Sequence, residues 1–570
     1  MERKSQKEEK KRISKKIDCK GLEFILCNAG IKVSYYKMQD LDLYKKVVKH
    51  FTIPVKQMSG YISHVYNHIL LKDTYTAILP RFGMLKYIND NFCNYKITNN
   101  IKYQLSNLHE SKELPLDNSS KKYYWNGVLN ENQKLIYNHI LKNYYRPENA
   151  SNGNAGVILN LEAGQGKSYL AAALIDKLQT KTIIICHTVS ILNQWVKMLE
   201  YDFPNMKIGK YYGGIKDDSQ ITVAIINSLL PDALINEGEI INYDEYFKHI
   251  GFVIFDEIHL YSSKYRKRIY NKCQSTYMLG LSATPDENKD GLDMINVWNC
   301  GEILIANNII GYNVENVSFT GDVLAVKYYG HPDYTKMEIT ESTEIINHSK
   351  MVNNLCCDPY RLKLVINYIM ELKNQQKFIF VFADRREYLN LIKQKLESQQ
   401  YNILAQEMLN DNDKSRIINL MGGSSSEDME YAKSHATVIL TTYQFCGTGV
   451  SIPKMDALIL ATPRKSKSKQ YVNRIFRLGS DYNKTRKIID IIDYATHMKS
   501  QWYKRKIYYD EKKLPITKVK VLWSDLSDPD MANPGISESE HEINYDIEHG
   551  AENNSENNSE NNSENNSDIE

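Results

Sequence analysis

The segment that most clearly could perform chemistry is a glycine-containing loop between an apolar run and an alanine-rich stretch. It reads LEAGQGKS and follows the run GVILN. Gly164 and Gly166 can let backbone N–H groups close around phosphate oxygens, and the N-terminus of a following helix attracts the same anion. Lys167 would reach the β- and γ-phosphates, and the Ser168 hydroxyl would ligate Mg²⁺. Leu161 stands where the strict phosphate-loop pattern has glycine, so the prediction depends on the flanking strand and helix.

A pair of carboxylates follows 89 residues after Lys167, in the sequence GFVIFDEIH. A carboxylate just past the C-terminal end of a parallel strand points into the crevice where such sheets bind ligands. Asp256 could hold Mg²⁺ there through water, and Glu257 could orient and deprotonate an attacking water. An isolated Asp-Glu pair is commonly a solvated turn. After a phosphate loop, it predicts the metal and base pair of a nucleotide hydrolase.

Alternating strand-like and helical segments predict the elements that position these residues. In 121–310 the strand-like runs are GVILNL, KTIIICH, ITVAIIN, GFVIFDE and TYMLGLS, and in 311–515 they are VLAVKYY, FIFVFAD, TVILTT, ALILAT and IIDIID. This alternation predicts an α/β fold class with two tandem domains whose parallel sheets are buried on both faces. Residues 1–20 are expected to be a charged disordered arm, 21–120 a small α+β accessory domain, and 516–570 a disordered acidic tail with four ENNS copies.

Composition narrows the class of protein further. The 570 residues suffice for about three domains, and the hydrophobic share of 42% with 25% charged residues excludes a fibrous or wholly disordered chain. No apolar run is long enough to predict a membrane span, and the N-terminus lacks the apolar region of a secretory signal. The nine cysteines form no CxxC motif. We therefore expect neither a disulfide framework nor a zinc or iron–sulfur cluster, and an intracellular, reducing compartment.

The charge is unevenly distributed along the chain. Residues 521–570 hold 14 of the 69 acidic side chains and none of the 72 basic ones, so residues 1–520 carry a net charge of +17. A basic body with an acidic tail predicts association with a polyanion. Two basic runs, SKYRKRIYNK after the carboxylates and RKSKSK from Arg464, could add phosphate contacts, although such runs are commonly just solvated.

Together with GLSATP, the phosphate loop and DEIH resemble the motifs of superfamily 2 DExH helicases. CHTVSILNQWVKMLE resembles the first nucleic-acid-contacting motif, with the NQW of the XPB-like branch, and YYGGIK and ITVAIINSLL resemble the next contact segments. KFIFVFADRREYLNLI, LTTYQFCGTGVSIPKMDALIL and QYVNRIFRLGS resemble motifs IV, V and VI. The resemblance covers about 129–493 and is strongest to the poxvirus-type transcript-release DNA helicases. It implies two RecA-like domains that hydrolyse ATP with Mg²⁺.

The resemblance also implies roles for individual residues. Arginines of motif VI would stabilise transition-state charge only when the two domains close. The implied catalytic residues are Glu257, Gln470, Arg474 and Arg477. Those implied to bind the nucleotide or its metal are Gln133, Gly164, Gln165, Gly166, Lys167, Ser168, Asp256 and Gly449. Those implied to contact nucleic acid are Thr188, Gln194, Asn227, Ser228, Arg385 and Thr448. His259, Ser282 and Thr284 would couple the two sites, and Trp195 is expected to pack its helix onto the sheet.

The function implied is an ATP-driven translocase on single-stranded or duplex DNA, with 3′-to-5′ polarity and RNA as a further possible substrate. RNA polymerase and a nascent transcript are the implied partners, and a virion or a cytoplasmic viral factory is the implied location. Three alternatives stay open. They are a repair or branch-migration helicase, an RNA helicase, and a non-catalytic module that binds nucleic acid without hydrolysing ATP.

Overall fold

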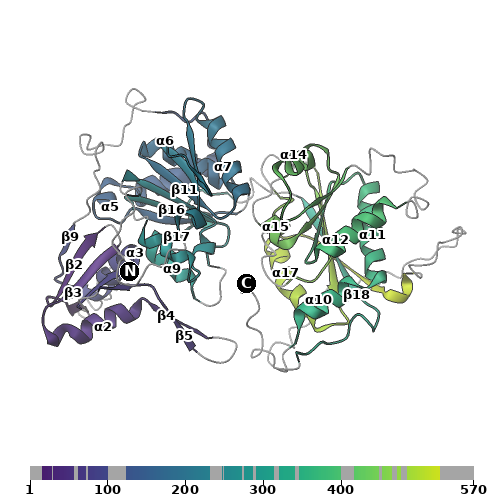
Figure 1. The fold of residues 1–570 in the computed structure, drawn as a ribbon, viewed down its shortest axis with the longest axis horizontal. Helices are drawn as coiled ribbons and strands as arrows, with labels where there is room; N and C mark the ends of the chain where they lie inside the picture. Colours follow the sequence, from purple (N-terminus) through teal and green to yellow (C-terminus); the bar gives the residue numbers. More distant parts are fainter. Residues whose placement is uncertain are drawn as a thin grey trace, which may run out of the picture. The chain divides into compact units, whose positions relative to one another are not determined.

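The computed structural model divides into two compact units, with the boundary between residues 314 and 315 (Figure 1). Both units are α/β, and each is described by itself below. The described residues are 16–27, 30–56, 62–71, 75–99, 123–162, 164–230, 247, 249–272, 275–286, 291–313, 320–340, 346–398, 416–447, 452, 454–464, 471–476 and 484–526.

Unit 1 is built on an eight-stranded sheet. From one edge to the other its strands are β13 (Ile215–Lys216), β12 (Ile208–Tyr212), β14 (Ile221–Ile225), β11 (Thr182–Cys186), β15 (Phe252–Asp256), β16 (Tyr277–Ser282), β10 (Gly156–Asn160) and β17 (Glu302–Ile305). Every neighbouring pair is parallel except β12–β13. The five apolar runs predicted to be strands in this part of the chain form β10, β11, β14, β15 and β16.

Both faces of this sheet are covered, which explains the unbroken apolar runs of its central strands. Val157 and Leu159 of β10 pack into one core, whereas Ile158 between them packs into another. The first core receives side chains from α4 (Glu131–Asn143), α6 (Lys167–Leu178) and α7 (Val189–Asp202). The second receives them from η4 (Ile258–Tyr261), η5 (Arg266–Asn271) and α9 (Asp293–Cys300).

The N-terminal part of unit 1 is an α+β module, as predicted. Its five-stranded sheet has the order β6 (Ile69–Leu70), β7 (Thr76–Leu79), β3 (Gly30–Tyr35), β2 (Leu22–Cys27) and β9 (Ile97–Asn99), with helices α2 (Leu41–His50) and α3 (Arg81–Asn91). Strands β4 (Thr52–Lys56) and β5 (Ile62–Tyr66) form a separate antiparallel hairpin. One expectation is wrong: the predicted disordered arm reaches residue 20, yet β1 (Ile17–Asp18) pairs in parallel with β8 (Phe92–Cys93). Residues 1–15 lie outside the described residues.

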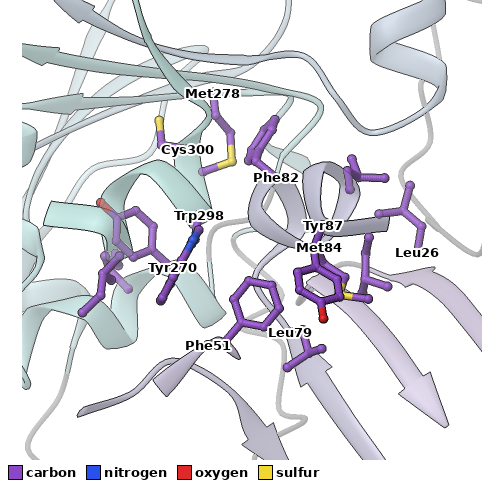
Figure 2. Packing of buried hydrophobic residues seen from close by; sticks show 14 of the residues in the cluster. Leu26, Phe51, Leu79, Phe82, Met84, Tyr87, Tyr270, Met278, Trp298 and Cys300 are labelled. Atoms are coloured by element: carbon purple, nitrogen blue, oxygen red, sulfur yellow. The ribbon is translucent and has the colours of Figure 1, made fainter. Parts of the chain in front are cut away.

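The N-terminal module shares a hydrophobic core with the α/β part of unit 1 (Figure 2). Phe51 and Phe82 of the module belong to the same buried cluster as Trp298 and Cys300 of α9. The Phe51 and Trp298 ring centroids are 5.1 Å apart, and a Cβ added at Gly83 would lie 2.6 Å from the Trp298 ring. This close approach requires glycine, because no larger residue fits between α3 and the indole.

Unit 2 contains a seven-stranded sheet in which every neighbouring pair is parallel. Its order is β20 (Ile417–Leu420), β21 (Val438–Thr442), β19 (Ile379–Ala383), β22 (Ala457–Leu460), β23 (Arg486–Asp493), β18 (Gly321–Tyr329) and β24 (Ile516–Leu522). Helices α11 (Pro359–Asn374) and α12 (Arg386–Glu397) fill the core on one face. Helices α14 (Ser426–His435), α15 (Tyr443–Gly447) and α17 (Ser500–Glu511) fill the core on the other. Two tandem α/β units with parallel sheets, a RecA-like architecture, are therefore confirmed.

The predicted start of the acidic tail at residue 516 is wrong. Strand β24 pairs in parallel with β18 over its whole length, and it buries Val519 and Val521. The sequence ITKVKVL alternates apolar and basic residues, which is the pattern of an edge strand with one buried face. Residues 527–570, with the ENNS copies, lie outside the described residues.

Candidate functional site

The C-terminal ends of three neighbouring strands meet at one edge of the unit 1 sheet. Strand β16 lies between β10 and β15, and its register aligns Asn160 with Ser282 and Asp256 with Leu281. The phosphate loop follows β10, the carboxylates end β15, and the SAT sequence ends β16. Because parallel strands place their carboxyl ends together, segments more than 120 residues apart in the sequence form one site.

The phosphate loop has the backbone that its glycines permit. Gly164 and Gly166 both have left-handed φ angles, of 84° and 83°, and Gly166 is the residue before α6. A side chain at either position would strain the turn. Lys167 begins α6, and its Nζ donates to the Leu161 carbonyl oxygen at 2.9 Å. The ammonium group thus bridges the two ends of the loop, at the positively polarised N-terminus of a twelve-residue helix.

The carboxylate pair stands at the end of β15. Burial, and secondarily the charge of Glu257, raises the pKa of Asp256 to about 6, while a hydrogen bond from Trp195 and the charge of Lys167 oppose the rise. Trp195 Nε1 donates to Asp256 Oδ2 at 2.9 Å. Glu257 itself has φ 52° and ψ 55°. This left-handed conformation costs a non-glycine residue about 1–3 kcal/mol and is concentrated at functional sites.

These groups fit a magnesium–nucleotide complex. The carboxylates of Asp256 and Glu257 are adjacent in the chain, and their negative charges repel each other; a dication would neutralise that repulsion. The Ser168 hydroxyl adds a hard oxygen at the start of α6, and oxygen is the donor that Mg²⁺ prefers. When bound, Mg²⁺ would offset the charge that develops on the phosphates. Lys167, the loop amides and Ser168 would hold the phosphates.

The three residues predicted to couple the nucleotide and nucleic-acid sites lie together. His259 Nδ1 is 3.0 Å from Ser282 Oγ and 3.4 Å from Glu257 Oε2, and Thr284 N–H donates to Ser282 Oγ at 3.0 Å. A continuous polar path therefore links Glu257 to the loop after β16. Tyr261 anchors η4 through its hydroxyl, which donates to the Ile185 carbonyl at 2.8 Å.

Gln133 is buried beside the phosphate loop rather than open to solvent. Its side chain completes a capping box with Asn130 at the start of α4, and its Nε2 donates to the Gln165 carbonyl at 3.2 Å. The structure thus places the predicted nucleotide-binding glutamine against the predicted loop. A role in reading adenine stays a prediction.

The residues predicted to contact nucleic acid in unit 1 lie in or directly before helices α7 and α8. Thr188 caps α7, with its Oγ1 accepting from the Ile191 N–H at 3.3 Å, and Gln194 Nε2 donates to Ser190 Oγ at 3.4 Å. Asn227 is exposed in the short helix α8 (Ile226–Leu229). Ser228 in the same helix accepts a hydrogen bond from Gly213 N–H at 3.1 Å.

In unit 2 the predicted residues are only partly within the described ranges. Arg385 precedes α12 and donates through Nη2 to Ser349 Oγ at 2.9 Å, which joins it to α10 (His348–Cys356). Arg474 is buried, with 7% of its surface exposed. The predicted residues Thr448, Gly449, Gln470 and Arg477 lie outside the described residues.

The first basic run, at Ser263–Lys272, is built into the fold at Lys267 and Lys272, whereas Lys264 and Arg268 are exposed. Lys267 Nζ donates to the Tyr66 carbonyl oxygen, and Lys272 Nζ donates to the Leu229 carbonyl at 3.2 Å. Burial, and after it the charges of Lys264 and Arg268, lowers the pKa of Lys267 to about 8. The run therefore joins η5 to the N-terminal hairpin. In the second run only Arg464 is described, and its Nη1 donates to Asp384 Oδ1 at 3.2 Å.

Two groups of residues that support the predicted motifs were not foreseen. Trp195 does pack in the core as expected, but its hydrogen bond to Asp256 was not predicted. In unit 2, Arg505 forms a buried two-point ion pair with Asp490 and also donates to the Arg464 carbonyl at 2.8 Å. For Trp195 and for Arg505, the sequence contains one signal: a side chain that carries an N–H group stands among the apolar residues of a helix face.

The raised pKa of Asp256 predicts how Mg²⁺ dependence changes with pH. Because a proton competes with the cation for this carboxylate, the Mg²⁺ concentration for half-maximal ATP hydrolysis should rise as the pH falls through about 6. The rise should approach tenfold per pH unit below that value, measured between about pH 5 and 8. ATP also titrates in this range, so the control is the pH dependence of Mg²⁺ binding to free ATP, measured without protein. A rise no larger than that of free ATP would contradict the prediction.

No helix in the described ranges is both long and apolar enough to cross a membrane. Within the same ranges no group of three or more His, Cys, Asp or Glu side chains is arranged to hold a metal ion.

Known proteins resemble this chain in the region that contains the site. The model of the family described as "Type III restriction enzyme, res subunit" matches residues 126–287, which contain the phosphate loop and both carboxylates. The chain is 31% identical over 382 residues to the "Putative ATP-dependent RNA helicase QP509L" of African swine fever virus (isolate Pig/Kenya/KEN-50/1950), which covers 63% of this chain and 69% of that protein. It is 25% identical over 417 residues to the "Putative ATP-dependent RNA helicase L396" of Acanthamoeba polyphaga mimivirus, covering 70% and 73%.

Two solved structures also match over much of their length. T4 UvsW is 15% identical, covering 88% of this chain and all of that one, with a TM-score of 0.31. Saccharomyces cerevisiae Dbp5 bound to RNA and ADP BeF3 is 13% identical, covering 70% and 95%, with a TM-score of 0.43. The strand order and register of each unit define its fold.

Proposed function

This chain belongs to the superfamily 2 helicases of large DNA viruses, the family of its African swine fever virus and mimivirus relatives, and from that premise we propose that it is a DExH motor that moves along nucleic acid. The observation that supports it most is the convergence of Lys167, Asp256 and Glu257 at one sheet edge, with His259 linking the base to the loop after β16. A module that had lost hydrolysis would have no need to keep this set.

Each group has a role in the proposal. Lys167 and Ser168 hold the phosphates and the metal, Asp256 holds the metal, and Glu257 orients and deprotonates the attacking water. His259, Ser282 and Thr284 transmit the state of the nucleotide to the nucleic-acid grip. The motif VI residues Gln470, Arg474 and Arg477 and the nucleotide-loop residue Gly449 keep their predicted parts within the same proposal.

We propose DNA as the polymer, with 3′-to-5′ movement, on the resemblance of the motifs to XPB-like and poxvirus-type enzymes. Under this proposal the motor acts in viral transcription, with RNA polymerase and a nascent transcript as partners, in the virion or the cytoplasmic viral factory. A second candidate is an RNA helicase. Its support is specific, because the African swine fever virus and mimivirus relatives are both named as RNA helicases.

Steady-state ATP hydrolysis with no polymer, single-stranded DNA, duplex DNA and RNA tests the proposal. We expect DNA to stimulate turnover by tenfold or more over the basal rate, as grip and hydrolysis are coupled. Stimulation by RNA alone would favour the second candidate. Turnover that no polymer changes would contradict both, and activity that survives in Glu257→Gln would show that a contaminant is being measured.

A further inference from the structure

The β4–β5 hairpin has two unlike faces. Val55 and Val65 pack on the core of unit 1, and Ile53 is buried in it. On the opposite face of β5, Ile62 is 52% exposed and Tyr66 is 58% exposed, with exposed His64 between them. In Figure 1 the hairpin extends from unit 1 as a ribbon separate from the five-stranded sheet. Large side chains gathered on an exposed face indicate an interaction site, because contact with solvent alone favours small polar side chains.

The rings on this face are ordered against one another. The His64 and Tyr66 centroids are 6.4 Å apart with an interplanar angle of 26°, and the His68 ring meets Tyr66 edge-on at 5.5 Å. Flat side chains held at regular spacing on a strand can stack with unpaired bases, and such stacking tolerates any base. Tyr66 keeps 58% of its surface exposed despite these two ring contacts, so a base can still reach it.

The surroundings of the hairpin are basic. Lys267 Nζ donates to the carbonyl oxygen of Tyr66, which brings η5 and its neighbours against the end of β5. Residues 263–272 hold five Lys or Arg and no Asp or Glu. Positive charge beside exposed rings is complementary to the phosphates of a nucleic acid. It is not complementary to an apolar protein surface that lacks acidic residues.

We propose that the outer face of the β4–β5 hairpin, with residues 263–272, is a second contact for single-stranded nucleic acid. Bases stack on Tyr66 and His64, and Lys264 and Arg268 meet the backbone phosphates. This inference rests on the proposed function, since it assigns an additional grip to the same motor. A single strand is the occupant because the bases of a duplex are not free to stack on the rings.

The test measures binding of the full chain, without nucleotide, to a fluorescently labelled oligothymidylate and to a duplex of equal length. Tyr66→Ala should weaken single-strand binding about fivefold or more, as loss of one stacked base does, and Tyr66→Phe should bind like wild type. Tyr36→Ala is the matched control, because Tyr36 is an exposed tyrosine of the same module that lies beside Glu23. Lys264→Ala should lower the slope of log K against log salt by about 0.7.

Different results separate a failure of the proposed function from a failure of the hairpin contact. If wild type binds no polymer, the proposed function itself is contradicted. If wild type, Tyr66→Ala and Tyr36→Ala all bind the single strand equally, the hairpin is not a contact and the proposal is overturned. Equal weakening by Tyr66→Ala and Tyr66→Phe would also overturn the proposal, because the hydroxyl and not the ring would then matter.

Discussion

Replacing Lys167 with alanine should reduce ATP hydrolysis at least about 100-fold in the presence of the stimulating nucleic acid. The ammonium group bridges the two ends of the phosphate loop, and no other described cation belongs to that loop. Removing it takes away the point charge that would meet the β- and γ-phosphates at the helix N-terminus. ATP affinity should fall together with turnover, measured by equilibrium binding of a fluorescent ATP analogue.

The matched control for this experiment is Lys177→Ala. Lys177 lies in the last turn of the same helix, so its loss changes the net charge equally but leaves the loop intact. Its turnover should stay within about twofold of wild type. Near-normal hydrolysis by Lys167→Ala, or equal losses in both variants, would remove the phosphate loop from the proposed mechanism.

Replacing Glu257 with glutamine should also reduce turnover at least about 100-fold, but ATP binding should survive. Glutamine has nearly the same shape and can keep a polar contact with His259, yet it cannot accept the proton of the attacking water. The variant should therefore hold ATP and nucleic acid together without hydrolysis. Single-turnover hydrolysis and analogue binding, measured side by side, separate this outcome from that of Lys167→Ala.

Glu200→Gln is the control for the carboxylate change, because Glu200 is exposed on α7 away from the strand ends. It should behave like wild type in both assays. Were Glu257→Gln to lose ATP binding as well as turnover, the left-handed Glu257 would be holding the loop in place, and another group would have to act as the base.

The strands were predictable because burial on both faces leaves a plain signal. Runs such as TIIIC and FVIFD contain almost nothing but apolar residues, and parallel sheets covered by helices require that composition. Once the strands were known, the positions of Lys167 and Asp256 followed, because both flank strand ends. The strand pattern thus predicted that the phosphate loop and Asp256 flank strand ends, whereas the roles of His259, Ser282 and Thr284 were implied by the resemblance.

Other features depend on contacts that no local pattern specifies. The hydrogen bond from Trp195 to Asp256 joins residues 61 positions apart, and an indole in an amphipathic helix is equally consistent with simple packing. Strand β24 was missed because its basic residues resemble a solvated tail until β18 is placed beside it. In both cases tertiary pairing decides the structure, while the local sequence permits several outcomes.

The core shared by the N-terminal module and α9 has a practical consequence for truncation. A shortened chain that begins after the N-terminal module would uncover Trp298, Cys300 and the other apolar side chains that Phe51 and Phe82 now cover. Such a fragment should aggregate or unfold even though it retains every motif of the motor. Deleting the N-terminal module would therefore reveal a loss of solubility rather than the function of the module. Point substitutions on its surface are the better test of that function.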